Sequence, residues 1–312
     1  MKPDIVVAPR LLDTVMERLE ASFTVHRLWE APDPTAFVAP INDKVRGFAS
    51  FTGYPVRADL IAALPKLEII ATMSVGLDHI DLAAAKARSI AVTYAPDVLT
   101  DCVADIGMTL ALAVARRIVV ADRFVREGKW LTGMFPLATK VGGATMGIVG
   151  LGRIGKAVAK RAEGFGMRIV YHGRHRQSDI AYPFYDDLLA MARDSDYLML
   201  TSPGGPATRH LVSAAVIEAL GPEGVLINIA RGSVVDEPAM VAALVAGKLG
   251  GAGLDVYEDE PRVPEALKAL DNVVLLPHLA SATVATRTIM GQLMIDNLKA
   301  HFAGKPLITP IA

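Results

Sequence analysis

Residues 145–155, TMGIVGLGRIG, contain the pattern that decides how the rest of the chain is interpreted. The apolar run Thr145–Val149 predicts a buried strand, and the three glycines of a Gly-x-Gly-x-x-Gly motif, Gly150, Gly152 and Gly155, follow it directly. The segment Lys156–Phe165 then predicts a helix. A strand, a glycine turn and a helix in this order form the unit that binds a dinucleotide in α/β proteins.

Each glycine of this motif has its own task in such a site. Gly150 permits the tight turn, Gly152 lets the backbone approach a pyrophosphate, and Gly155 lets helix and strand pack closely. Arg153 and Ile154 stand within the motif, just before the predicted helix, whose free N–H groups attract phosphate, and both are candidate cofactor-binding residues. A glycine-rich turn without a ligand is the alternative, and the position between a predicted strand and a predicted helix argues against it.

The residues after the next predicted strand, Met167–His172, indicate which dinucleotide binds. An NAD site normally has Asp or Glu at this point, about 20 residues beyond the glycines, to bind the ribose 2′-hydroxyl. Gly173 stands there instead, and Arg174, His175 and Arg176 follow it. Two guanidinium groups without a carboxylate suit a 2′-phosphate, so we expect NADPH or NADP, with NAD less favoured. A solvated basic loop is the alternative.

The rest of the chain alternates strands and helices on both sides of a long apolar helix predicted at 101–121. Such alternation is typical of parallel sheets covered on both faces. Before that helix we expect strands at 5–8, 23–29, 46–50, 67–73 and 90–94, helices at 11–21, 58–64 and 82–88, and a proline-rich connection after residue 29. After residue 172 we expect strands at 197–201, 225–230, 252–256 and 273–276 and helices at 214–220 and 237–246.

A last helix is predicted at 282–302, after the second set of strands is complete, and is expected to return to the first set. We therefore predict an α/β fold with two doubly wound, Rossmann-like parallel-sheet domains. Residues 1–98 and 282–312 would form a discontinuous, flavodoxin-like substrate-binding domain closed by the C-terminal helix. Residues 99–281 would form the dinucleotide-binding domain.

Composition excludes several classes of protein. The chain has 312 residues and a mass of 33.2 kDa, which is ample for two domains of about 150 residues. The net charge of −1 gives no basic surface for nucleic acid or an anionic membrane, so neither is expected as a partner. No uncharged apolar stretch approaches the roughly 18 residues that span a bilayer. The single cysteine, Cys102, excludes an intramolecular disulfide framework and a cysteine-based zinc site, so we expect a cytoplasmic protein without a metal.

Three ionisable residues follow predicted strands of the second domain: Arg231, Glu260 and His278. Ligands of open α/β sheets bind beyond the carboxyl ends of the strands, so these side chains are expected to converge. Arg can grip a carboxylate, His can transfer a proton near neutral pH, and Glu can hold His in one tautomer. Each residue taken singly could be structural, and Glu258 or Asp259 could take the place of Glu260.

The chain resembles the D-isomer-specific 2-hydroxyacid dehydrogenases over essentially its whole length. The matching segments come in the order of that family: SVGLDHID at 74–81, GLGRIG at 150–155, NIARGSVVDE at 228–237, GLDV at 253–256 with Glu260-Pro261, and PHLASAT at 277–283. The resemblance implies that Arg231 binds substrate, that Glu260 partners the histidine and that His278 is the acid/base. It also implies that the backbone N–H groups of Val75 and Gly76 bind the substrate carboxylate.

The resemblance carries further expectations about binding and assembly. Ala230 and Asp255 would hold the nicotinamide carboxamide, and the basic residues after Gly173 resemble those of the NADPH-dependent glyoxylate/hydroxypyruvate reductases. Residues 52–54 and Leu77 lie near the place expected for the substrate side chain. Homodimers are usual in the family, and the long helix with the segment after it resembles the dimerisation region, where Trp130 would face the partner's active site.

The expected activity is the NADPH-dependent reduction of small 2-keto acids, with glyoxylate and hydroxypyruvate first, to D-2-hydroxy acids, with His278 as proton donor. One alternative is a dinucleotide-sensing, corepressor-like binding protein of the same fold. Another is an NAD-dependent member of the family that acts on a different 2-hydroxy acid.

Overall fold

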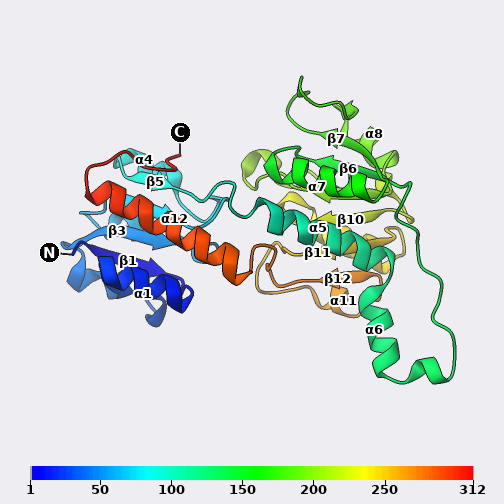
Figure 1. Ribbon diagram of the computed structural model, residues 1–312, viewed down its shortest axis with the longest axis horizontal. Helices are drawn as coiled ribbons and strands as arrows, with labels where there is room; N and C mark the ends of the chain where they lie inside the picture. Colours follow the sequence, from blue (N-terminus) through cyan, green and yellow to red (C-terminus); the bar gives the residue numbers. More distant parts are fainter. Residues whose placement is uncertain (1, 312) are drawn as a thin grey trace. The chain divides into compact units, whose positions relative to one another are not determined.

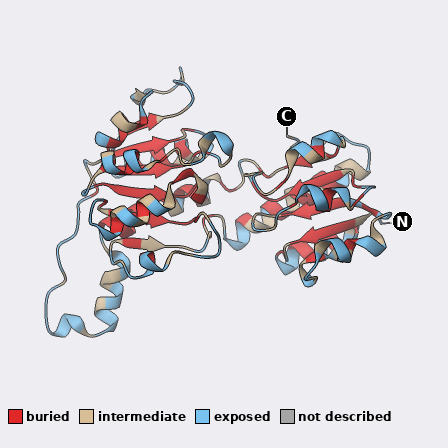
Figure 2. Cartoon of the chain, turned by 180° about the vertical axis from the view of Figure 1, so that it is seen from behind, coloured by how far each residue is buried: buried red, intermediate tan, exposed pale blue. Residues whose placement is uncertain are grey.

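The structure, a computed structural model, describes residues 2–311 and contains two compact units (Figure 1). Residues up to Leu99 and those from Ala282 onward make the first unit, and Thr100–Ser281 makes the second. Figure 2 shows that in each unit the strands are buried and the helices around them are exposed on their outer sides.

The first unit contains a five-stranded sheet in the order β2-β1-β3-β4-β5. Its described strands pair in parallel, and this requires the crossover helices that the chain supplies between them. The elements are β1 (Asp4–Ala8), α1 (Asp13–Ser22), β2 (Thr24–Arg27), α2 (Pro34–Val38), β3 (Val45–Ser50), α3 (Ala58–Ala62), β4 (Ile69–Thr72), α4 (Leu82–Ala87), β5 (Ala91–Thr93) and α12 (Val284–Phe302).

Side chains alternate between the two faces of this sheet, and each face is covered. Val6, Phe48 and Ile70 join a buried cluster that also contains residues of α3 and α4. On the other face, a Cβ atom at Gly47 would lie 3.4 Å from Leu298 of α12. The C-terminal helix therefore packs on the first sheet, because the missing side chain of Gly47 leaves room for it.

The second unit contains a seven-stranded sheet in the order β12-β11-β10-β9-β6-β7-β8, and its described strands also pair in parallel. The predicted fold class is thus confirmed. The elements are α5 (Thr100–Ala115), α6 (Ile118–Arg126), β6 (Thr145–Val149), α7 (Arg153–Gly164), β7 (Arg168–His172), β8 (Phe184–Tyr185), α8 (Leu188–Arg193), β9 (Tyr197–Leu200), α9 (Ala214–Leu220), β10 (Val225–Asn228), α10 (Glu237–Val245), β11 (Gly251–Leu254), α11 (Glu265–Lys268) and β12 (Val273–Leu275).

The helix predicted at 101–121 is not continuous. It divides into α5 and α6 at Arg117, whose φ of 51° lies in the left-handed region and cannot continue a right-handed helix. Leu110 of α5 packs against Gly253 of β11, so α5 is a core helix of its own unit. Most large apolar residues of α6 and of the segment after it are exposed, and this part projects away from the rest of the unit (Figure 1).

Smaller differences from the expected elements have local causes. The proline-rich connection contains the short helix α2, because Asp33 accepts hydrogen bonds from the N–H groups of Thr35 and Ala36, and Pro34 suits the first helical position. The strand predicted at 23–29 ends at Arg27 and continues as a 3₁₀ turn. The short elements β8, α8 and α11 were not predicted, since segments of this length show little periodicity. Within residues 2–311, none of the helices has the length and apolarity to cross a bilayer.

Candidate active site

The glycine turn between β6 and α7 has the backbone that a phosphate-binding loop needs. Gly150 has a φ of +94°, and a Cβ atom there would lie 2.8 Å from the backbone of Ser202. A Cβ atom at Gly155 would lie 2.5 Å from the carbonyl oxygen of Gly150. Gly150 therefore meets a conformational and a steric requirement, and Gly155 a steric one, as the motif predicts.

The same turn leaves room for a ligand. Gly152 is the N-cap of α7, no side chain caps this helix end, and no heavy atom lies within 4 Å of a Cβ built there. Beside the turn, the hydroxyl of Ser202 is buried and has no hydrogen-bond partner in the described part of the chain. Open space over a helix N-terminus and an unsatisfied buried hydroxyl fit the pyrophosphate of a dinucleotide.

The basic residues after β7 are tied to the glycine turn. Arg174, His175 and Arg176 are exposed. The side-chain amide of Gln177 donates to the carbonyl oxygen of Leu151 at 2.7 Å, and its backbone N–H donates to the Tyr171 hydroxyl at 2.8 Å. Sequence reasoning missed Gln177, because nothing in the sequence shows that its side chain turns back toward the motif.

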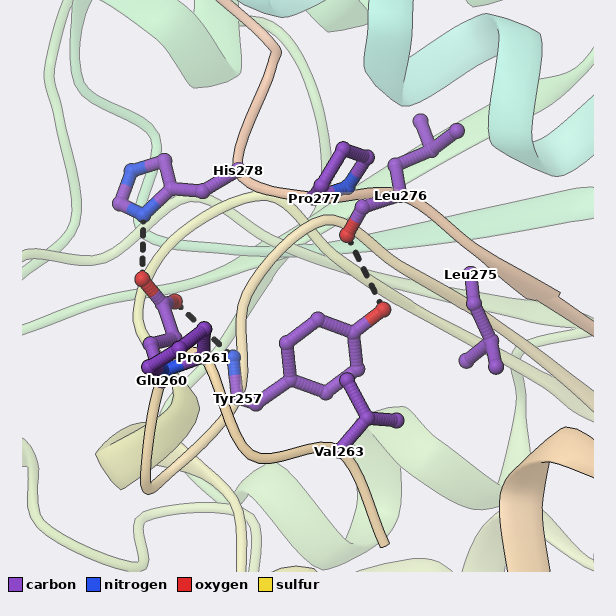
Figure 3. A pocket seen from close by; sticks show the side chains of 8 residues that line it. All are labelled: Tyr257, Glu260, Pro261, Val263, Leu275, Leu276, Pro277 and His278. Atoms are coloured by element: carbon purple, nitrogen blue, oxygen red, sulfur yellow. Dashed lines mark hydrogen bonds and ion pairs between the residues drawn. The ribbon is translucent and has the colours of Figure 1, made fainter. Parts of the chain in front are cut away.

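His278 and Glu260 form a hydrogen-bonded pair, drawn in Figure 3. The Nδ1 atom of His278 lies 2.7 Å from a carboxylate oxygen of Glu260, and the other carboxylate oxygen accepts the N–H of Tyr257 at 3.1 Å. These bonds fix the carboxylate and leave Nε2 as the outward nitrogen of the ring. Both residues line a cavity of about 250 Å³ whose other walls are apolar side chains from 257–263 and 275–277.

Charges around Glu260 keep it ionised. Burial by itself raises the pKa of this carboxyl. The hydrogen bond with His278, the N–H of Tyr257 and the electrostatic attraction of His278 and Arg231 together lower the pKa by more, so the net pKa is below the ordinary value. Arg231 follows β10, where its Nη1 donates to the carbonyl oxygen of Ala230 at 2.7 Å. The structure thus brings Arg231, Glu260 and His278 into one electrostatic group.

The two other acids of this loop have different partners. Glu258 accepts a hydrogen bond from Arg209 at 2.7 Å and lies 3.3 Å from the ring of His210. Asp259 binds Arg262 at 2.6 and 2.8 Å. Of the three acids, Glu260 is therefore the one that pairs with His278 in the structure.

Asp255 fastens the loop that carries His278. Its side chain is 1% exposed, and its two carboxylate oxygens accept the N–H groups of Leu279 at 2.7 Å and Ala280 at 2.9 Å. Its backbone oxygen accepts the N–H of His278 at 2.8 Å. Burial raises the pKa of this carboxyl. His278 has a φ of 52°, and these bonds hold it in that unfavourable conformation. This role was not expected, and the contact of Asp255 and Ala230 with a carboxamide stays a prediction.

Val75 and Gly76 lie in the first unit, in the loop after β4. The hydroxyl of the buried Ser74 accepts the N–H of Thr52 at 2.9 Å and lies 2.7 Å from the Thr52 hydroxyl, so the loops after β3 and β4 are joined. Their binding of a substrate carboxylate stays a prediction. Within residues 2–311 no three His, Cys, Asp or Glu side chains are grouped to hold a metal ion.

Known proteins are similar to this chain over most or all of its length. Residues 108–280 match the family model for the NAD binding domain of the D-isomer specific 2-hydroxyacid dehydrogenases. Hydroxyphenylpyruvate reductase from Plectranthus scutellarioides is 49% identical over 96% of each chain, and glyoxylate/hydroxypyruvate reductase A from Arabidopsis thaliana is 48% identical over 94% of each. The solved NADPH-dependent glyoxylate/hydroxypyruvate reductase from Sinorhizobium meliloti, in complex with NADP and malonate, is 44% identical. Its TM-score is 0.95, and the match covers 100% of this chain and 97% of that one.

These matches include both units, and therefore extend beyond the nucleotide-binding fold that many unrelated enzymes share. The chain belongs to the D-isomer-specific 2-hydroxyacid dehydrogenases and is an oxidoreductase of that family.

Proposed function

We propose that this protein reduces small 2-keto acids to D-2-hydroxy acids with NADPH. The observation that carries the proposal is the 2.7 Å pair of His278 and Glu260 beyond the strand ends of a dinucleotide-binding sheet. In this proposal residues 99–281 bind the dinucleotide, and residues 1–98 with 282–312 bind the substrate.

His278 acts as the proton donor. Its Nδ1–H is held by the Glu260 carboxylate, so the ring presents Nε2 to the substrate. The histidine side chain is 29% exposed, which leaves it accessible to a small ligand. As the ketone oxygen gains negative charge, Nε2 gives its proton to it, and a hydroxyl group forms.

Arg231 holds and polarises the substrate. A guanidinium can bind a carboxylate with two parallel hydrogen bonds, and it can stabilise the charge that develops on the neighbouring carbonyl oxygen. The backbone N–H groups of Val75 and Gly76 would also bind that carboxylate. Arg231 would thus orient the keto acid toward Nε2 of His278.

The residues that would hold the cofactor are those of the glycine turn and of the basic loop. Gly150, Gly152 and Gly155, with the N–H groups of α7 at Arg153 and Ile154, would hold the pyrophosphate. Ala230 and Asp255 would hold the carboxamide. Arg174 and Arg176, with His175, would bind the 2′-phosphate. When bound, the nicotinamide supplies the hydride. The preference for NADPH is supported by the Sinorhizobium meliloti relative, which is named NADPH-dependent and was solved with NADP.

The relatives support the substrate class and leave the side chain open. Two of them are named for glyoxylate and hydroxypyruvate, and one for hydroxyphenylpyruvate. Glyoxylate and hydroxypyruvate therefore head the candidate substrates. The test is an assay of purified protein with a panel of 2-keto acids and each cofactor. We expect reduction with NADPH as the more efficient cofactor. Cofactor binding without turnover of any keto acid would favour the corepressor-like alternative.

We also propose a homodimer formed through the projecting segment 118–137, here termed the apolar arm. Its exposed side chains include Val125 at 55%, Trp130 at 65%, Leu131 at 91% and Leu137 at 98% exposure. Several large apolar side chains exposed in one projecting segment are typical of a subunit interface. Light scattering should give about twice the chain mass of 33.2 kDa. A concentration-independent monomer would refute the dimer. Cys102, as the single cysteine, fits a reducing cytoplasmic setting.

A further inference from the structure

A second cavity lies in the first unit, at the carboxyl edge of its sheet. It has a volume of about 260 Å³. Residues that directly follow β3 and β4, and residues that come shortly after β1, line it. The beginning of α12 also lines it. The lining residues are Arg10, Leu11, Leu12, Phe51, Met73, Ala282, Thr283, Val284 and Arg287. The carboxyl edge is where open α/β sheets bind their ligands.

This cavity adjoins the loop proposed to bind the substrate carboxylate. Phe51 and Met73 directly precede Thr52 and Ser74, the two residues whose side chains join the loops after β3 and β4. Val75 comes immediately after Ser74. A keto acid whose carboxylate is held by that loop would therefore have this cavity close to its remaining carbon atoms.

The lining combines an apolar wall with two cations. Leu11 and Met73 are buried, and the Phe51 ring has the Arg287 guanidinium 4.2 Å above its centre, which fixes that charge at the wall. Arg10 is an exposed residue that also pairs with Asp13 at 2.9 Å. The lining residues include two guanidinium groups and no carboxylate, so the cavity favours a ligand with a negative end.

We propose that this cavity receives the side chain of the 2-keto acid and selects 2-keto dicarboxylic acids, whose side chain is apolar along its length and ends in a carboxylate. The inference rests on the proposed function and specifies its substrate class. Arg10 and Arg287 would bind the far carboxylate, and the apolar wall would contact the methylene groups. Glyoxylate has no side chain and would leave the cavity to water.

The test compares two keto acids of equal length, 2-oxoadipate and 2-oxohexanoate, which differ in the terminal carboxylate. We expect kcat/KM for 2-oxoadipate to exceed that for 2-oxohexanoate by about tenfold in the parent, because a charge-assisted contact is made with one acid alone. Arg10→Gln and Arg287→Gln should each reduce this ratio about threefold or more. Arg18→Gln is the matched control, because Arg18 lies on α1, bonds Gln292 and does not line the cavity. It should leave the ratio unchanged.

Each outcome decides between the inference and the function on which it rests. Equal or higher efficiency with 2-oxohexanoate in the parent would overturn the inference. So would a preference for 2-oxoadipate that both cavity variants leave intact. If Arg287→Gln does not fold, the exposed Arg10 provides the decisive variant. Reduction of glyoxylate but of neither longer acid would overturn the inference and leave the proposed function standing. A parent that reduces no keto acid with either cofactor would overturn the proposed function, and the inference with it.

Discussion

Two loops at the carboxyl edge of the second sheet are held in different ways. The loop at 277–281, which carries His278, is held by Asp255, a buried carboxylate that accepts hydrogen bonds from two backbone N–H groups of the loop. The basic loop at 173–177 is exposed and is held through the side chain of Gln177 and the hydroxyl of Tyr171. The first loop is anchored by a buried side chain, and the second is held at the surface of the unit.

The difference suggests a division of tasks. Proton transfer requires a side chain in one fixed place, and a buried anchor supplies such precision. Binding a phosphate at the edge of the cofactor requires charge and reach, which exposed arginines on a surface loop provide. Changes at the buried anchor should therefore affect the reaction and the stability of the fold. Changes at the basic loop should affect the affinity for one cofactor.

The largest effect is expected at His278. His278→Ala removes the proton donor, so kcat for keto-acid reduction should fall about 10²–10⁴-fold. Binding of NADPH, measured by fluorescence titration, should survive because no proposed cofactor contact is lost. Near-parent turnover in this variant would show that another group supplies the proton.

Asp255→Asn tests the buried anchor. The amide keeps one oxygen acceptor but turns its NH₂ group toward a backbone N–H, so one buried donor is left without a partner. We expect the free energy of unfolding, measured in urea, to fall by about 1–3 kcal/mol. We also expect kcat to fall, because His278 is no longer held in one position. Asp259→Asn, in the exposed pair with Arg262, is the control and should leave the unfolding midpoint unchanged. Equal midpoints for both variants would contradict the anchoring role.

Substitution of Arg174 and Arg176 together by Ala tests the surface loop. KM for NADPH should rise about tenfold or more, while KM for NADH should barely change, because the 2′-phosphate contact alone is lost. Gln177→Ala should move the same ratio in the same direction by a smaller factor, since it loosens the loop without removing charge. Equal catalytic efficiency with both cofactors in the parent would refute the NADPH assignment.

The regular parts of the fold could be predicted because their periods are visible in the sequence. Strands such as Thr145–Val149 are buried apolar runs, and the glycine turn has a fixed spacing. The break in the long helix could not be predicted, because Arg117 has a side chain that ordinarily favours a continuous helix. Its left-handed conformation comes from the tertiary fold, and with it the exposure of the apolar arm.

Prediction of the candidate site from the sequence succeeded and failed for similar reasons. Strand-end placement predicted that Glu260 and His278 come close, and the structure pairs them. The anchoring bonds of Asp255 and Gln177 could not be predicted, since both join backbone groups that any residue carries. Arg10 and Arg287 lie near opposite ends of the sequence and line the same cavity, and no local sequence pattern indicates that they come together. Sequence therefore predicted residues that act through chemical identity better than residues that act through backbone position.

The smallest and most specific effect is expected at Glu260. The pKa of its carboxyl is lowered overall, so it is negatively charged near neutral pH and favours the protonated form of His278. Glu260→Gln keeps an oxygen to accept from Nδ1 but removes the charge. Reduction requires a proton on Nε2 of His278, and the variant lacks the negative charge that favours it, so the alkaline limb of the rate profile should move to lower pH. Glu258→Gln, whose carboxylate binds Arg209, is the control and should leave this limb in place. If the limb moves in the control and not in Glu260→Gln, Glu258 is the group that sets the charge state of the histidine.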